Sequence, residues 1–243
     1  MTTRITALVG FVILIATFPG LSAFFRAYAQ GPGGNGGTPT IESAGNTLKE
    51  VFELSDEIPQ VVLDRADCII VFPSVSKAAF IVGSSDARGV MTCRTGENFN
   101  GPWGAPSMMA LEAGSLGSQA GGEALDLILL VMNERGAKEL LREKAKIGSD
   151  ASAAAGPVGR NVAAETDVTQ RTGILTYSRA RGVFAGVSLV GSTLRPDGDA
   201  NEQVYRKNIP AEEIVLKRAV PPPPSAKLLL SLLESRSPKK MHW

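Results

Sequence analysis

The sequence predicts an α+β domain with a curled antiparallel β-sheet or barrel-like core, helices on its N-terminal side and one helix in mid-chain. Several short apolar or β-branched runs follow one another with connections too short for a helical crossover. Two other stretches space their apolar residues at three and four, as one face of a helix does. A length of 243 residues suits one domain with appendages, which can bury a sizeable core.

The first part of the chain is expected to lie outside that domain. Arg4 precedes an uncharged apolar stretch, and Ala27-Tyr28-Ala29 has the small-residue form of a cleavage site. We therefore expect a signal peptide over residues 1–29 and export to the periplasm or out of the cell. If the segment is retained instead, residues 5–25 would anchor the chain in the inner membrane.

Residues 30–42 are rich in Gly and Pro, which predicts a flexible linker, and the folded part is expected to start after Thr40. Thr47-Leu-Lys-Glu50 has the form of a capping box and opens a stretch with helical spacing. Pro59 ends that helix and can open a second, short helix that reaches Ala66.

The strands are predicted from apolar runs bounded by turn-forming residues: Cys68–Phe72, Ala78–Gly83, Gly89–Arg94, Ser107–Leu116, Leu125–Met132, Thr172–Ala180 and Val183–Leu194. The last two flank Arg181-Gly182, which resembles a hairpin turn. Between the two groups, residues 134–146 carry an apolar stripe and a favourable Glu134–Lys138 pair, so they predict the mid-chain helix.

Composition excludes several classes of function. The 25 Lys and Arg nearly balance the 24 Asp and Glu, so the chain lacks the excess of cations typical of nucleic-acid binding. The single histidine, His242, is next to the end of the chain, where a catalytic base or metal ligand lacks a scaffold. We expect no cofactor and no metal. Cys68 and Cys93 lie in two strand-like runs and form either a disulfide or two buried thiols.

The remaining motifs have simple structural explanations beside sharper functional ones. The glycines of residues 114–122 and 156–159 could cradle a phosphate, but they match no phosphate-loop pattern and are better explained by strand bends and close backbone approaches. Glu112, Glu123 and Asp126 have no spacing that fixes an acid/base pair, so no catalytic residue is predicted. Trp103 is either an anchor at a membrane interface or a staple that holds a loop on the sheet.

Several segments together resemble a known family. They are IIVFPSVSKAAFIVG, GPWGAPSMMALEAGSLGSQAGG, LILLVMNERG, AAGPVGR and ILTYSRARGVFAGVSLVGSTLRPD. In this order they resemble the SYLF domain, or Ysc84 family, over residues 43–207. The resemblance implies a lipid-binding module and not an enzyme, because eukaryotic members are associated with phosphoinositides and, in yeast, with actin. Actin is not expected as a partner of an exported chain.

A Pro-rich break and a leucine-rich basic tail occupy residues 208–243. Residues 47–57 carry one cation against four carboxylates, so an anionic membrane would repel that helix, and the tail is the better candidate. The predicted lipid contacts are Lys227, Leu229, Leu230, Leu233, Arg236, Lys239, Lys240 and, from the loop, Trp103. The alternative is that the tail forms a helix docked on the domain's own sheet.

Two functions follow from these observations. The first is an exported, non-enzymatic domain that binds phosphoinositide-like or other anionic phospholipid at a membrane of the cell envelope. The second is a structural or protein-interaction module without direct lipid binding, in which the Pro-rich break and the tail dock an envelope protein.

Overall fold

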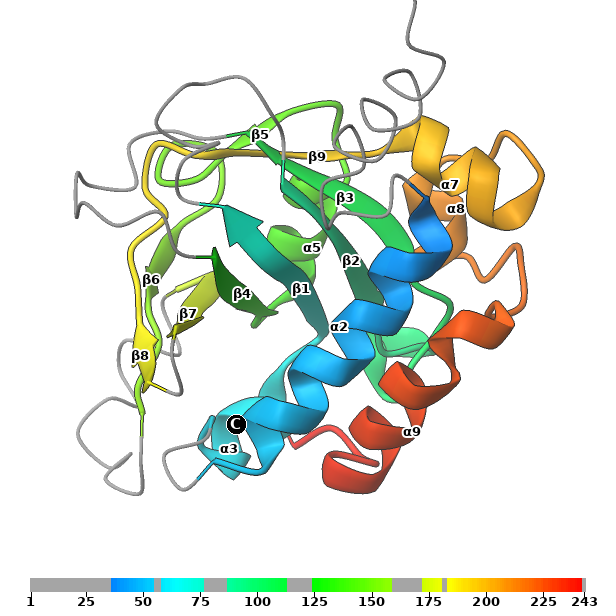
Figure 1. Cartoon of the computed structure of the whole chain (residues 1–243). Helices are drawn as coiled ribbons and strands as arrows, with labels where there is room; N and C mark the ends of the chain where they lie inside the picture. Colours follow the sequence, from blue (N-terminus) through cyan, green and yellow to red (C-terminus); the bar gives the residue numbers. More distant parts are fainter. Residues whose placement is uncertain are drawn as a thin grey trace, which may run out of the picture. The chain divides into compact units, whose positions relative to one another are not determined.

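The structure is a computed structural model that describes residues 36–54, 58–76, 87–112, 124–158, 172–180 and 183–241. Its centre is a nine-stranded sheet with the order β5-β9-β3-β2-β1-β4-β7-β6, in which β8 also pairs with β7 (Figure 1). The pairs are antiparallel except for β6 with β7. The strands are β1 (Cys68–Ser76), β2 (Ala87–Cys93), β3 (Ser107–Glu112), β4 (Ala124–Val131), β5 (Ala145–Lys146), β6 (Ala153–Ala155), β7 (Ile174–Ala180), β8 (Val183–Gly186) and β9 (Thr193–Pro196).

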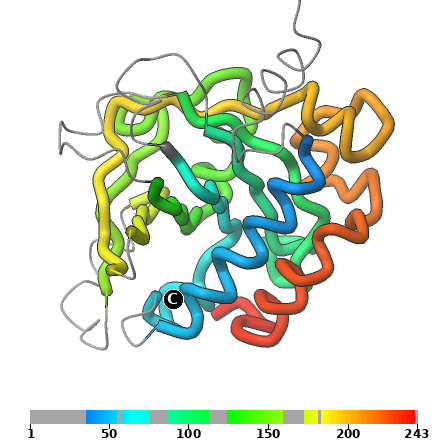
Figure 2. Tube along the Cα trace, viewed as in Figure 1, coloured from blue at the N-terminus to red at the C-terminus, as the bar shows by residue number. Residues whose placement is uncertain are grey.

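Helices pack on both faces of the curled sheet and beside one of its ends (Figure 1). They are α2 (Gly37–Phe52), α3 (Gln60–Arg65), α5 (Glu134–Leu140), α7 (Gly198–Tyr205), α8 (Ala211–Val215) and α9 (Lys227–Arg236), with short 3-10 turns η1 (Glu97–Phe99) and η3 (Pro224–Ala226). Figure 2 shows the red C-terminal helix α9 running beside the blue helix α2, and the two are in contact. Among the described residues, no helix combines the length and apolar character needed to cross a bilayer.

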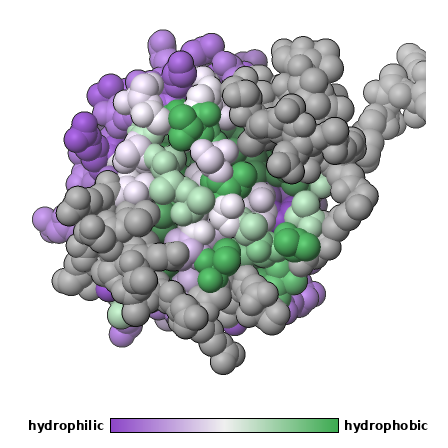
Figure 3. Space-filling view, turned by 90° about the vertical axis from the view of Figure 1, so that its left-hand side faces the viewer, coloured by the Kyte–Doolittle hydropathy of each residue, from purple (hydrophilic) through white to green (hydrophobic). Residues whose placement is uncertain are grey.

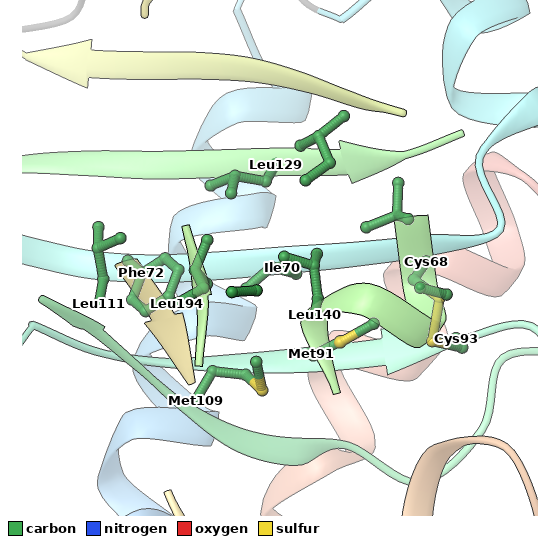
Figure 4. Packing of buried hydrophobic residues seen from close by; sticks show 14 of the residues in the cluster. Cys68, Ile70, Phe72, Met91, Cys93, Met109, Leu111, Leu129, Leu140 and Leu194 are labelled. Carbon is green, nitrogen blue, oxygen red and sulfur yellow. A yellow bond between two sulfur atoms is a disulfide. The ribbon is translucent and has the colours of Figure 1, made fainter. Parts of the chain in front are cut away.

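The central strands are buried on both faces, so two apolar clusters flank the sheet. We call the cluster on the concave face of the curled sheet the inner cluster and the one on its other face the outer cluster. Successive residues of β1 point to opposite faces, so Ile70 and Phe72 belong to the inner cluster and Ile69 and Val71 to the outer one. Figure 4 shows the inner cluster, which the curled sheet surrounds and to which α5 and α8 contribute. The outer cluster lies between the sheet and the helices α2, α3 and α9.

The fold class predicted from the sequence, an α+β domain with a curled sheet, is confirmed. The short helix after Pro59 and the Glu134–Lys138 pair, 2.6 Å between Nζ and Oε1, are also present. The predicted strand at residues 78–83, part of the strand 107–116, the turn 181–182 and most of the glycine-rich motifs lie outside the described residues, as do residues 1–35.

The first long helix begins earlier than predicted. Residues 37–42, expected in the flexible linker, form its first turns, and Thr47 is a buried mid-helix residue instead of a cap. Pro39 is tolerated there because the amide groups of a first turn have no partner within the helix. Glycine is required at position 37 by a contact with another helix, because a Cβ there would lie 2.3 Å from Cγ2 of Val204 on α7.

Two further elements differ from the prediction. The mid-chain helix ends at Leu140 instead of continuing to residue 146, because Ala145 and Lys146 pair with β9 as β5. The predicted strand 183–194 is divided into β8 and β9, and Gly191 between them has a φ of 92°, which a continuous strand does not allow.

Residues 208–241 belong to the same compact unit as the sheet. Leu229 and Leu233 of α9 are fully buried in the outer cluster, and Ile214 of α8 is buried in the inner one. The C-terminal part is therefore packed as part of the domain and not as a separate tail, which is the docked alternative drawn from the sequence.

Candidate functional site

A polar cavity of about 360 Å³ lies where α2 passes the ends of β1, β4 and β7. We call it the charged hollow. Its lining residues are Ser43, Asn46, Thr47 and Glu50 of α2, Ser74 of β1, Ala124 and Asp126 of β4, and Arg179 and Ala180 of β7. The four α2 residues recur at three and four positions, so the helix presents one polar stripe to the hollow while its apolar stripe packs on the sheet.

An irregularity in β1 shapes one wall of the hollow. The register of β1 against β4 shifts between Phe72 and Val75, and Ser74 has a φ of 52°. The backbone N–H of Ser74 then points at Asp126 and donates to its Oδ1 over 2.9 Å. A Pro-Ser bulge in the strand thus fixes the position of a carboxylate that faces the hollow.

Arg179 connects the two carboxylates of the hollow. Its Nη2 lies 2.6 Å from Oδ2 of Asp126, and its Nη1 lies 2.5 Å from Oε2 of Glu50. Burial opposes the charge of the guanidinium, but the hydrogen bonds and charges of both partners raise the pKa of Arg179. Among the described residues that line the hollow, one cation stands against two carboxylates, so their net charge is negative and does not favour a bare anion.

Exposed valines begin at the rim of this hollow. Val183 of β8 pairs with Ala180, which lines the hollow, and is 68 % exposed. Val158 and Val190 are 44 % and 54 % exposed and follow β6 and β8 in the chain. We call these three side chains the valine face. Figure 3 looks onto this side of the molecule; in the coloured part, hydrophobic residues lie among near-neutral ones, and hydrophilic residues border them at the upper left.

The valine face lies on the outer edge of the sheet. β6 pairs with the first half of β7 and β8 with the second half, so together they form one continuous edge. Residues 151–158 and 183–194, which supply this edge, contain no charged side chain. In the sequence, Val183 and Val190 belong to a strand-like run and Val158 to a glycine motif. Only the pairing of β6 and β8 with β7 brings the segments that carry these valines to one edge of the sheet.

Trp103 is buried and holds two segments of the domain together; it is not an exposed membrane anchor. It is 6 % exposed, and its indole Nε1 donates to the carbonyl of Ser237 over 3.1 Å. The guanidinium of Arg94 lies 4.4 Å from the ring centroid and donates to the same carbonyl over 2.9 Å. Trp103 and Arg94 thus hold the segment after α9 against the domain, and Trp103 is not available to a membrane in this structure.

The other predicted lipid contacts do not form one surface. Leu229 and Leu233 are fully buried and Leu230 is half-buried, because α9 turns this side toward α2 and the sheet. Arg236 stacks on Phe52 with 5.1 Å between its Cζ and the ring centroid, and Lys240 forms an ion pair with buried Asp67. Lys227 and Lys239 are the two of these cations with exposed side chains.

The structure joins Cys68 and Cys93 in a disulfide between β1 and β2. Both cysteines are fully buried, so the bond lies inside the inner cluster. Among the described residues, no group of three His, Cys, Asp or Glu side chains could hold a metal ion.

Comparisons with known proteins place this chain in a family. Residues 112–236 match the model of the Ysc84 family, described as Las17-binding protein actin regulator. Protein YSC84 of Saccharomyces cerevisiae is 32 % identical over 193 residues, which cover 77 % of this chain and 40 % of the yeast protein. The human SH3 domain-containing YSC84-like protein 1 is 29 % identical over 205 residues, covering 82 % of this chain and 58 % of that protein. The chain thus spans about two fifths to three fifths of the length of these relatives.

Proposed function

Since the chain belongs to the Ysc84 family, we propose that it is a non-enzymatic domain that binds phospholipid at the surface of a cell-envelope membrane, after export guided by residues 1–29. The family description names a binding and regulatory role, which agrees with a domain that acts by contact. The observation that carries the lipid part of the proposal is the uncharged sheet edge with three exposed valines.

An uncharged apolar edge is suited to the boundary between headgroups and acyl chains. Complete burial of one valine side chain stabilises by about 1.5–3 kcal/mol, so three partly exposed valines together supply a few kcal/mol. Such an energy gives reversible association, and a charged residue in the same segments would oppose it. The negative charged hollow beside Val183 favours a headgroup that carries a positive end over a purely anionic one.

The tail cations give a competing contact on another side of the molecule. α9 and the β6–β8 edge lie at opposite sides of the view in Figure 1, so the two contacts belong to different parts of the surface. Lys227 and Lys239 would each contribute on the order of 1 kcal/mol near an anionic surface, and salt would remove that energy. The two contacts therefore differ in their dependence on salt and on lipid charge.

Liposome flotation of residues 30–243 tests the proposal. Vesicles of phosphatidylcholine, with and without phosphatidylserine, are used at low and high salt. We expect binding to both compositions that persists at high salt and falls at least about tenfold in Val183→Asp with Val190→Asp. Leu228→Asp is the matched control, because Leu228 is 37 % exposed on α9, away from the valine face.

The other outcomes are equally informative. Binding only to the anionic vesicles, lost at high salt and in Lys227→Glu with Lys239→Glu, would place the contact on the tail and support the anionic preference implied by the family. Absence of binding to every composition would overturn the lipid proposal. Point variants are needed because deleting the tail would remove buried leucines of the core.

A further inference from the structure

Four consecutive prolines, Pro221–Pro224, connect α8 to α9 across the surface. Pro221, Pro222 and Pro224 are exposed and Pro223 is half-buried. In the view of Figure 1 the segment runs along the right-hand side, away from β6 and β8. It is therefore separate from the valine face.

The covalent structure of this segment sets its conformation. Each proline fixes its own φ near −65° and pushes the residue before it into extended backbone. Pro223 shows the result, with a φ of −72° and a ψ of 155°, which are polyproline II values. This helix has three residues per turn, so Pro221 and Pro224 lie on one side of it about 9 Å apart.

The domain holds this segment at both of its ends. Val220 packs against the inner cluster and Ala226 is fully buried in the outer one. The amide of Ala226 also donates to the carbonyl of Pro223 over 2.9 Å. Because the segment is already ordered, a partner that binds it loses little conformational entropy.

Exposed cations lie near both ends of the proline run. Arg218 lies three residues before Pro221, and Lys227 lies three residues after Pro224. Neither cation has an ion pair among the described residues, whereas Lys217 pairs with Glu213 over 2.7 Å. The result is a rigid apolar ridge with an available positive charge near each end.

We propose that Pro221–Pro224 is a docking ridge for a partner protein whose surface carries an aromatic-lined groove with carboxylates beside it. Exposed polyproline segments with paired prolines bind grooves of this kind, as in SH3 and WW domains, because flat aromatic rings pack against the proline rings. Arg218 then pairs with a groove carboxylate and fixes the direction of binding. This interaction is independent of the phospholipid proposal, since Arg218 and the prolines are outside the valine face.

The test uses the full chain and two isotope-labelled probes: a WW domain and the SH3 domain of the human SH3 domain-containing YSC84-like protein 1. The chain is titrated into each probe, and NMR shifts of the groove aromatic residues are followed. We expect saturable shifts with at least one probe. Pro221→Ala with Pro224→Ala should weaken binding at least about tenfold, and Arg218→Glu should do so in a salt-dependent way.

Pro222→Ala is the matched control. It removes one proline of the same run but keeps the pair on one side of the ridge, so binding should change by less than about threefold. Unchanged thermal unfolding of each variant shows that its fold is intact. Absence of shifts with both probes at about 1 mM would overturn the proposal. An equal loss in Pro222→Ala and in the double variant would also overturn it, because the paired face would then have no role.

Discussion

Gly156 illustrates how one residue is fixed by its packing. A Cβ at this position would lie 2.1 Å from Cζ of Tyr177, whose ring is fully buried and stacked on Phe184 at 5.2 Å between centroids. The ring has no room to retreat, so Gly156→Ala should lower the free energy of unfolding by about 2–3 kcal/mol. Urea denaturation measures this loss.

Gly198→Ala is the control for that substitution. Its added Cβ would meet no atom within 4 Å, and alanine is the better helix former at the start of α7. The free energy of unfolding should therefore stay the same or rise slightly. Equal losses at both positions would show that the contact with Tyr177 is not what requires glycine at 156.

Glu112 gives the stability of the domain a dependence on pH. It accepts from Nε of Arg195 over 2.8 Å and pairs with Nζ of Lys144 at 3.3 Å, and the Arg195 hydrogen bond is the main cause of its lowered pKa. A carboxyl group whose pKa is lower in the folded than in the unfolded state stabilises the fold. This contribution is complete at pH values above the unfolded pKa of 4.5 and is lost as the pH falls through the folded pKa. Because these side chains are partly exposed, the contribution is at most about 1 kcal/mol.

Glu112→Gln should therefore reduce the free energy of unfolding by up to about 1 kcal/mol at pH 7 and by almost nothing at pH 3. Urea denaturation across this pH range measures the difference. Glu143→Gln is the control, since Glu143 is exposed and takes part in no ion pair among the described residues. A loss that is the same at pH 3 and pH 7 would contradict the electrostatic origin.

At the scale of secondary structure, two kinds of bond join β1 to β2: the hydrogen bonds of the antiparallel strand pair and the disulfide. Cys68 and Cys93 are separated by 25 residues, and a loop of about this size, closed in the unfolded chain, stabilises the fold by about 3 kcal/mol. Reduction under unfolding conditions should lower the free energy of unfolding by that amount. The variant Cys68→Ala with Cys93→Ala should lose a similar amount and be insensitive to reductant, which urea titrations with and without dithiothreitol would show.

The elements that the sequence predicted correctly are those with a local signal. β1 and β4 contain nearly continuous apolar runs, and Pro59 marks the start of α3 without reference to other parts of the chain. Strands β5 and β6 could not be predicted. Ala145–Lys146 is a strand only because it pairs with β9, and Ala153–Ala155 only because it pairs with β7. The early start of α2 was missed for the same reason, since the fit of Gly37 against α7 is a tertiary contact.

At the scale of the whole molecule, the candidate sites depend on how distant segments are brought together. Asp126 and Arg179 come from β4 and β7, and Glu50 comes from α2, so no spacing in the sequence indicates the charged hollow. The valine face needs β6 and β8 on one edge of β7. The tail is the opposite case: its leucines and cations are adjacent in sequence, but the fold separates them into buried and exposed sets.

The burial of α9 makes a prediction about the domain as a single cooperative unit. Leu233 is fully buried against α2 and the sheet, whereas Leu228 on the same helix is 37 % exposed. Leu233→Ala should lower the free energy of unfolding by about 2–4 kcal/mol, and Leu228→Ala by less than about 1 kcal/mol. Urea denaturation followed by both Trp fluorescence and circular dichroism would measure each loss and show whether unfolding stays a single transition. If Leu233→Ala were as mild as Leu228→Ala, α9 would not be part of the core, and its leucines would again be available as the membrane contact expected from the sequence.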